Sequence, residues 1–303
     1  EVDTAAGSYQ GLPSPLASDV SVFRGLAFAA PPVGDMRWKP PLPPATFSGV
    51  RLAERSGSAC WQARTSDNSV YARGNLDRSE DCLTLNVFTA AVDESAGLPV
   101  MIWFHGGSNT AGHGGARIFD GTNLAARGAV VVTANYRLGP LGFLAHPALT
   151  AESEQAASGN YGLLDQVAAL QWVQKNIAHF GGDPGRVTIF GQSAGGEDVC
   201  LLMASPLTTG LIHRVIGQSP SSGCVRLERP LQGGADSAHA SGVRFLGALG
   251  IKDSGALALA AMRDLSPEEI TATASSEGNS TGPIIDGWVL PEAPARLFAQ
   301  GDY

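Results

Sequence analysis

The chain has 303 residues, of which 44% are hydrophobic and 16% charged, with 38 glycines and 19 prolines, a composition that suits a large globular α/β protein. The net charge is −8 and no block of lysine and arginine occurs, which argues against a nucleic-acid partner. The longest apolar runs, such as 129–132, fall far short of the roughly 20 residues that cross a bilayer, so no membrane span is expected.

The first 50 residues are rich in proline and glycine. Short strand-like pieces such as 20–23 alternate with loop segments such as 30–34, which predicts hairpins and a long surface loop. The character changes near residue 98, because 99–104 and 129–134 are continuous apolar runs. Strands covered on both faces have this pattern, so we expect central strands of a mostly parallel sheet.

A helical stripe of apolar residues follows between 162 and 178, formed by Leu163, Val167, Leu170, Val173 and Ile177. The segment Gly181-Gly182-Asp183-Pro184 is expected to end this helix, because glycine adopts the left-handed cap and proline stops the helix.

A β-branched and aromatic run at 186–190 leads into Gly-x-Ser-x-Gly at 191–195, and helix-compatible residues follow to 204. A further strand is predicted at 215–219, and two or three helices are predicted between 235 and 275. This alternation implies a doubly wound α/β domain with helices on both faces of the sheet, preceded by the N-terminal hairpins.

The context of Ser193, a strand, a sharp turn and a helix, is the one that a nucleophile elbow requires. A serine attacks a carbonyl carbon only when a base removes its proton and donors stabilise the oxyanion. One donor is expected at the backbone N–H of Ala194, and others in the glycine-rich loop 105–108 that follows an earlier strand. Two motifs in the expected order indicate a serine hydrolase.

Six further segments carry a resemblance along the chain: FRGLAFAAPPVG at 23–34, SEDCLTLNVF at 79–88, NYRLG at 135–139, GNYGLLDQ at 159–166, FGGDP at 180–184 and PIIDG at 283–287. With these, the chain resembles the type B carboxylesterase family, which includes cholinesterases and bacterial para-nitrobenzyl esterases within the α/β-hydrolase fold. The resemblance implies hydrolysis of small-molecule carboxylic esters through an acyl-enzyme on Ser193. It also implies oxyanion donors at Gly107, Ser108 and Ala194, without a cofactor or metal.

The chain has four cysteines, none in the Cys-x-x-Cys spacing of a zinc site. The resemblance pairs Cys60 with Cys82 and places the tip of their loop near the rim of the active-site gorge. For Cys200 and Cys224, a bridge and two buried thiols stay equally open. The even number favours an oxidising compartment, and the chain begins without an initiator methionine, so we expect a processed or trimmed start and a secreted or periplasmic protein.

The chain departs from the family pattern at two places. Gln192 replaces the glutamate that often precedes the nucleophile, which removes the basis for selecting cationic substrates. Asn109 stands where an aromatic residue is commoner, which suggests a more polar acyl pocket. Glu197 and Asp198 follow the elbow closely, and we interpret them as first-turn carboxylates that stabilise the positive end of the helix dipole.

The other two members of a catalytic triad are expected beyond Tyr303. In this fold the order is serine, acid, histidine, and the resemblance puts the acid well after 283–287, so Asp286 is interpreted as a turn residue. Residues 1–303 are therefore expected to form one incomplete α/β-hydrolase domain, roughly the first three-fifths of a family member, and to be inactive alone. None of the six histidines is assigned to catalysis: His105, His113, His146, His179, His213 and His239.

Two other functions stay open. A cholinesterase-like binding or adhesion module would keep the fold without chemistry, although such modules usually lose the nucleophile, and Ser193 is intact. A lipase with a long acyl tunnel is the third possibility, because the part expected beyond Tyr303 would supply much of the pocket. The oligomeric state is not predicted.

Overall fold

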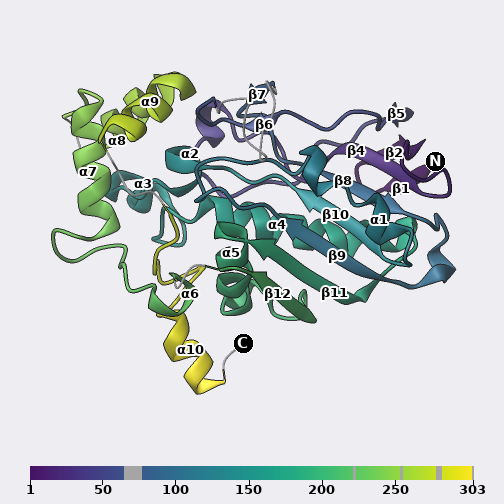
Figure 1. The fold of residues 1–303 in the computed structure, drawn as a ribbon. Helices are drawn as coiled ribbons and strands as arrows, with labels where there is room; N and C mark the ends of the chain where they lie inside the picture. The colour runs from purple at the N-terminus through teal and green to yellow at the C-terminus, as the bar shows by residue number, and fades with distance from the viewer. Residues whose placement is uncertain (65–76, 221–222, 253–254, 278–281, 302–303) are drawn as a thin grey trace.

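A seven-stranded sheet forms the centre of the computed structural model, which describes residues 1–64, 77–220, 223–252, 255–277 and 282–301 (Figure 1). The strand order is β12-β11-β9-β10-β8-β4-β3. The strands are β3 (Leu12–Pro13), β4 (Ser21–Ala27), β8 (Thr84–Thr89), β9 (Leu98–Phe104), β10 (Val130–Ala134), β11 (Gly182–Gln192) and β12 (Arg214–Gln218).

The sheet is mixed. Strands β12, β11, β9 and β10 run parallel to one another. The other three strands follow by antiparallel pairs, β8 with β10, β4 with β8 and β3 with β4. The parallel half contains the strands predicted from the apolar runs and from the residues before Ser193. The expected strand at 20–23 is also present, as part of β4 in the same sheet. Parallel pairs require crossover connections, and the helices between these strands supply them.

The N-terminal residues form the predicted hairpins. Strands β1 (Val2–Thr4) and β2 (Gly7–Gln10) pair antiparallel, and β5 (Val50–Leu52) joins β2 in parallel. A separate two-stranded sheet contains β6 (Ala59–Cys60) and β7 (Arg78–Ser79).

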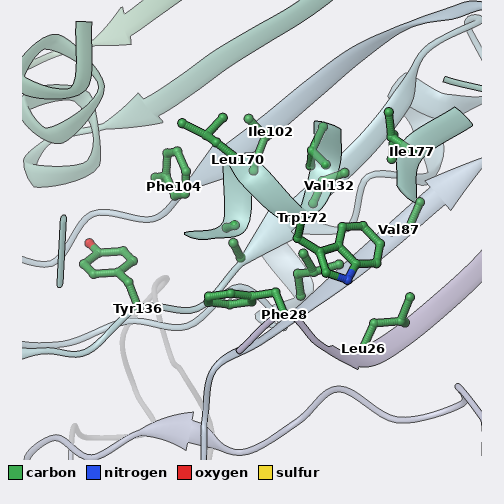
Figure 2. Packing of buried hydrophobic residues seen from close by; sticks show 14 of the residues in the cluster. Leu26, Phe28, Val87, Ile102, Phe104, Val132, Tyr136, Leu170, Trp172 and Ile177 are labelled. Atoms are coloured by element: carbon green, nitrogen blue, oxygen red, sulfur yellow. The ribbon is translucent and has the colours of Figure 1, made fainter. Parts of the chain in front are cut away.

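Both faces of the large sheet are covered, because neighbouring residues of a strand point to opposite faces. On one face, Val132 packs in the main core with Leu170 and Trp172 of helix α4 (Tyr161–Asn176), as Figure 2 shows. On the other face, Val131 packs with Ala125 of helix α1 (Thr122–Ala125). Burying each such side chain contributes about 1.5–3 kcal/mol, which explains why these strands are apolar at nearly every position.

Helix α4 is the helix predicted between 162 and 178, and a 3₁₀ turn continues it over Ile177–Phe180. Gly181 ends it with a φ of 79°, the left-handed cap expected from the sequence. The chain then enters β11 and the next crossover, α5 (Ala194–Met203), which packs on the same side of the sheet as α4.

A second core lies beside the sheet, under a group of helices seen at the left of Figure 1. Three of them confirm the helices predicted between 235 and 275: α7 (Ala238–Ala248), α8 (Ala256–Asp264) and α9 (Pro267–Glu277). None of the helices in the described ranges combines the length and apolar character of a membrane span. The remaining helices are α2 (Gly139–Phe143), α3 (Pro147–Glu152), α6 (Gly223–Arg226) and α10 (Pro294–Gln300).

Two disulfide bonds join the four cysteines. Cys60 is bonded to Cys82, and Cys200 on α5 is bonded to Cys224 on α6, the pair whose state the sequence left open. Residues 65–76, which include the tip of the loop that Cys60 and Cys82 close, lie outside the described residues.

We expect the double variant Cys60→Ala/Cys82→Ala to lose about 3 kcal/mol of unfolding free energy, because the bond closes a loop with a sequence separation of 22 residues. Urea unfolding of the full-length protein measures this loss. A reductant should destabilise the wild type more than the variant. An unchanged unfolding midpoint in the double variant would contradict the expectation.

Candidate active site

Ser193 lies at the carboxyl end of the parallel strands, between the last residue of β11 and the first residue of α5. Its backbone has φ 55° and ψ −123°, a region that costs a residue other than glycine about 1–3 kcal/mol. The Ser193 N–H donates to the carbonyl of Gln218 at the end of β12, at 3.0 Å. The hydroxyl makes no capping bond to α5. This is the elbow predicted from the sequence, and its turn holds the hydroxyl clear of the helix.

The glycines around Ser193 are required by close backbone contacts. A Cβ at Gly191 would lie 2.8 Å from the Phe104 carbonyl oxygen, and a Cβ at Gly195 would lie 2.8 Å from the His105 carbonyl oxygen. A Cβ at Gly106 would lie 3.2 Å from the Ser193 Cβ. The loop after β9 therefore passes directly against the elbow, and no side chain fits between them.

This loop, residues 105–109, contains two of the three predicted oxyanion donors. The φ angles are 121° at Gly107, 56° at Ser108 and 55° at Asn109. The Gly107 carbonyl accepts the N–H groups of Thr110 at 3.0 Å and Ala111 at 3.1 Å, which fixes the peptide orientation.

In the part of the chain that the structure describes, no acceptor takes the N–H group of Gly107, Ser108 or Ala194. Ala194 is also the first residue of α5, where the helix dipole favours negative charge. Three backbone donors thus belong to the segments that adjoin Ser193, an arrangement suited to an anionic oxygen.

A buried polar cluster lies beside this loop. Asp198 on α5 is fully buried and accepts hydrogen bonds from Asn109 Nδ2 at 3.0 Å and from Gln166 Nε2 at 2.7 Å. The Tyr136 hydroxyl lies 2.6 Å from the His105 carbonyl and 3.1 Å from Asn109 Oδ1, both acceptors. The Tyr136 ring stacks on the His105 ring with centroids 4.5 Å apart.

Two expectations change with this cluster. Glu197 lies in the first turn of α5 as expected, but Asp198 is not a dipole-stabilising surface group, because its carboxylate is enclosed and hydrogen-bonded to side chains. The amide of Asn109 is also buried and bonded within the cluster, so the structure does not show the polar acyl pocket that we expected from this residue. The sequence showed only that positions 109 and 198 are polar. The hydrogen bond between Asn109 and Asp198 explains why both residues are polar.

Burial raises the pKa of Asp198 to about 7, against the lowering effect of the Asn109 and Gln166 hydrogen bonds. Between about pH 4 and pH 7, the folded state therefore holds a proton on Asp198 that the unfolded state, with a pKa near 3.9, releases. Stability from this group is fully present below about pH 4 and is lost as the pH rises through 7.

We therefore expect the unfolding free energy to fall by about 1.4 kcal/mol more between pH 6 and pH 8 in the wild type than in Asp198→Asn. Urea unfolding at several pH values measures both slopes. The comparison isolates Asp198 from His146, whose pKa burial lowers to about 4 and which acts in the opposite direction. Equal slopes would contradict the burial effect.

The histidines and Asp286 have other partners. His179 pairs with Glu94, and His239 bonds Thr150. The Asp286 carboxylate accepts the N–H groups of Trp288 and Leu290, which confirms its turn role. In the described residues, no group of histidine, cysteine, aspartate and glutamate is arranged to hold a metal ion. The remaining histidine contacts are His105 Nδ1 with the Gly106 carbonyl, and the acceptors His113, His146 and His213 for the N–H groups of Gly115, Ala148 and Val187.

Comparisons with known proteins agree with this geometry. The model of the carboxylesterase family matches residues 1–303. The chain is 43% identical to a fumonisin B1 esterase of Sphingopyxis macrogoltabida, over 99% of this chain and 53% of that protein. It is 40% identical to the para-nitrobenzyl esterase of Bacillus subtilis, over 93% of this chain and 56% of that protein.

A solved carboxylesterase of Geobacillus stearothermophilus superposes with a TM-score of 0.84 and 36% identity, covering 99% of this chain and 60% of that one. The chain thus spans about half the length of the curated relatives it matches. The fold is that of the α/β-hydrolases, with the sheet, the elbow and the glycine-rich loop in the order the sequence indicated. With its whole length matched by the family model and its fold shared with solved members, the chain belongs to the carboxylesterase family.

Proposed function

We propose that the whole protein hydrolyses small-molecule carboxylic esters through an acyl-enzyme on Ser193. One observation carries the proposal: the strained Ser193 turn lies against a loop in which the N–H groups of Gly107 and Ser108, like that of Ala194, are not taken by acceptors in the described residues. Such donors stabilise charge that develops in the transition state more than charge in the ground state, which is what accelerates a reaction.

The chemistry follows from these groups. The Ser193 oxygen bonds to the ester carbonyl carbon while a base takes its proton. The carbonyl oxygen, now negative, accepts N–H groups of Gly107, Ser108 and Ala194. The alcohol leaves with the proton when the carbonyl re-forms, which gives an acyl-serine. Water then attacks the acyl carbon by the same route, releases the carboxylic acid and restores the hydroxyl.

The base and its acidic partner are proposed to lie after Tyr303, in the order serine, acid, histidine. The length of the relatives supports this, since the chain covers only 53% of the fumonisin B1 esterase. In this proposal residues 1–303 are the N-terminal part of a single α/β-hydrolase domain. The two disulfide bonds favour a secreted or periplasmic location.

No observation favours the non-catalytic binding module. The strained backbone at Ser193 lowers the stability of the fold, and a protein that only binds a partner gains nothing in return. The relatives named above act on unlike esters, according to their names, so the proposal is limited to the ester bond and leaves the acyl and alcohol groups open.

A fluorophosphonate probe tests the proposal, because it phosphonylates a serine only when a base activates the hydroxyl. We expect the full-length protein to be labelled on the peptide that contains Ser193, and residues 1–303 alone to stay unlabelled. Full-length protein that stays unlabelled would overturn the proposed function. Labelled 1–303 would overturn the placement of the base after Tyr303.

A further inference from the structure

The cluster of Asp198, Asn109 and Tyr136 joins parts of the site that come from different elements. Asn109 belongs to the loop after β9, Tyr136 follows β10, and Asp198 lies on α5. Their exposed fractions are 3%, 0% and 0%. Burying polar groups to this extent costs free energy unless each group is hydrogen-bonded. Water does not reach these three residues, so other protein groups have to supply the hydrogen bonds.

The conformation of the loop 105–109 depends on contacts with its surroundings. Ser108 and Asn109 both have positive φ angles, which are uncommon for residues other than glycine, although asparagine adopts them more often than serine. Such a conformation persists only when its surroundings determine it. The Asn109 carbonyl accepts the Gly139 N–H at 2.6 Å, and the Asn109 side chain bonds Asp198 and Tyr136, so three contacts converge on this one residue.

The contacts connect the two ends of the loop. The Tyr136 hydroxyl reaches the His105 carbonyl at the start and the Asn109 amide at the end. Gly107 and Ser108 lie between these two points. Asp198 then links Asn109 to α5, the helix that begins with Ala194. One carboxylate thereby connects the element that holds the first two donors to the element that holds the third.

We propose that Asp198 is a positioning residue that, through Asn109, holds the N–H groups of Gly107 and Ser108 in register with Ser193 and Ala194. The proposal rests on the proposed function, since it concerns the oxyanion site of that reaction. Asp198 does not touch the substrate, and its effect is on the transition state, where small displacements of a donor matter most.

A double-mutant cycle on the full-length protein tests the proposal with Asp198→Ala, Asn109→Ala and both together. We expect each single variant to lower kcat about 10-fold to 100-fold with KM unchanged, and the double variant to lose no more than the worse single one. The affinity for a trifluoromethyl ketone, which forms an oxyanion on the serine, should fall by the same factor.

Asn176→Ala is the matched control. Asn176 is equally buried, and its amide bonds the carbonyl of Trp172 and the N–H of Ala5, away from the loop. It should lower the melting temperature as the cluster variants do, while kcat and ketone affinity stay at wild-type values. If Asp198→Ala does not fold, Asn109→Ala compared with Asn176→Ala keeps the proposal testable, because it removes the same hydrogen bond from its other end.

Cluster variants that lose melting temperature but keep wild-type kcat and ketone affinity would overturn the proposal. Additive losses in the cycle would also overturn it, because they would show that the two residues act separately. The outcome is distinct from failure of the proposed function, which would appear first as a wild type without ester hydrolysis and without labelling of Ser193.

Discussion

Replacing Ser193 with alanine is expected to lower kcat/KM for ester hydrolysis by about 10⁴-fold to 10⁶-fold, because no acyl-enzyme can form without the hydroxyl. The oxyanion donors are backbone groups and stay in place, so ester binding should be retained. Steady-state hydrolysis of a chromogenic ester by the full-length protein measures the loss. Activity within 10-fold of the wild type would show that another residue is the nucleophile.

A second substitution at the same position separates chemistry from strain. Ser193→Gly should be equally inactive but more stable than Ser193→Ala by about 1–3 kcal/mol, because glycine adopts φ 55° and ψ −123° without the Cβ penalty. Urea unfolding of the two variants gives the difference directly. Equal stabilities would mean that the turn stores no strain at Ser193.

Gly195→Ala is expected to lower kcat by about 10²-fold to 10³-fold, the effect of losing an oxyanion donor, and to lower stability by about 1–3 kcal/mol. The added Cβ would meet the backbone carbonyls of Phe104 and His105, with 2.8 Å to the latter. Backbone atoms cannot rotate away as side chains do. The loop 105–109 and the start of α5 must therefore separate, which moves Gly107 and Ser108 away from Ala194. Hydrolysis kinetics and urea unfolding measure the two effects.

Gly247→Ala is the control for this change. Gly247 lies within α7, and a Cβ there would meet no atom within 4 Å. Alanine should raise stability by about 0.5–1 kcal/mol and leave kcat unchanged. If Gly195→Ala behaved as Gly247→Ala does, the close approach of loop and elbow would be wrong.

Much of the fold is local in origin and was therefore predictable. The strands β9 and β10 are apolar at nearly every position because both of their faces are covered, and this leaves a continuous run in the sequence. The end of the helix that became α4 was visible in Gly181, because its φ of 79° suits glycine. Other features were not readable, such as the antiparallel half of the sheet, since strand order depends on contacts between distant segments.

The candidate site likewise contains features that were predictable from the sequence and features that were not. The elbow at Ser193 and the glycine-rich loop at 105–108 are short motifs, because a tight turn and a close backbone approach each demand glycine at particular positions. The sequence by itself therefore determined the family, the candidate nucleophile and the candidate donors.

Only the tertiary structure decided what Asp198 and Asn109 do. They are 89 residues apart in the chain, and their polar character had a separate, plausible reading at each position. A hydrogen bond between buried groups depends on where two elements meet, and here a loop after β9 meets helix α5. That meeting point is a property of packing across the sheet, which no local pattern of residues encodes.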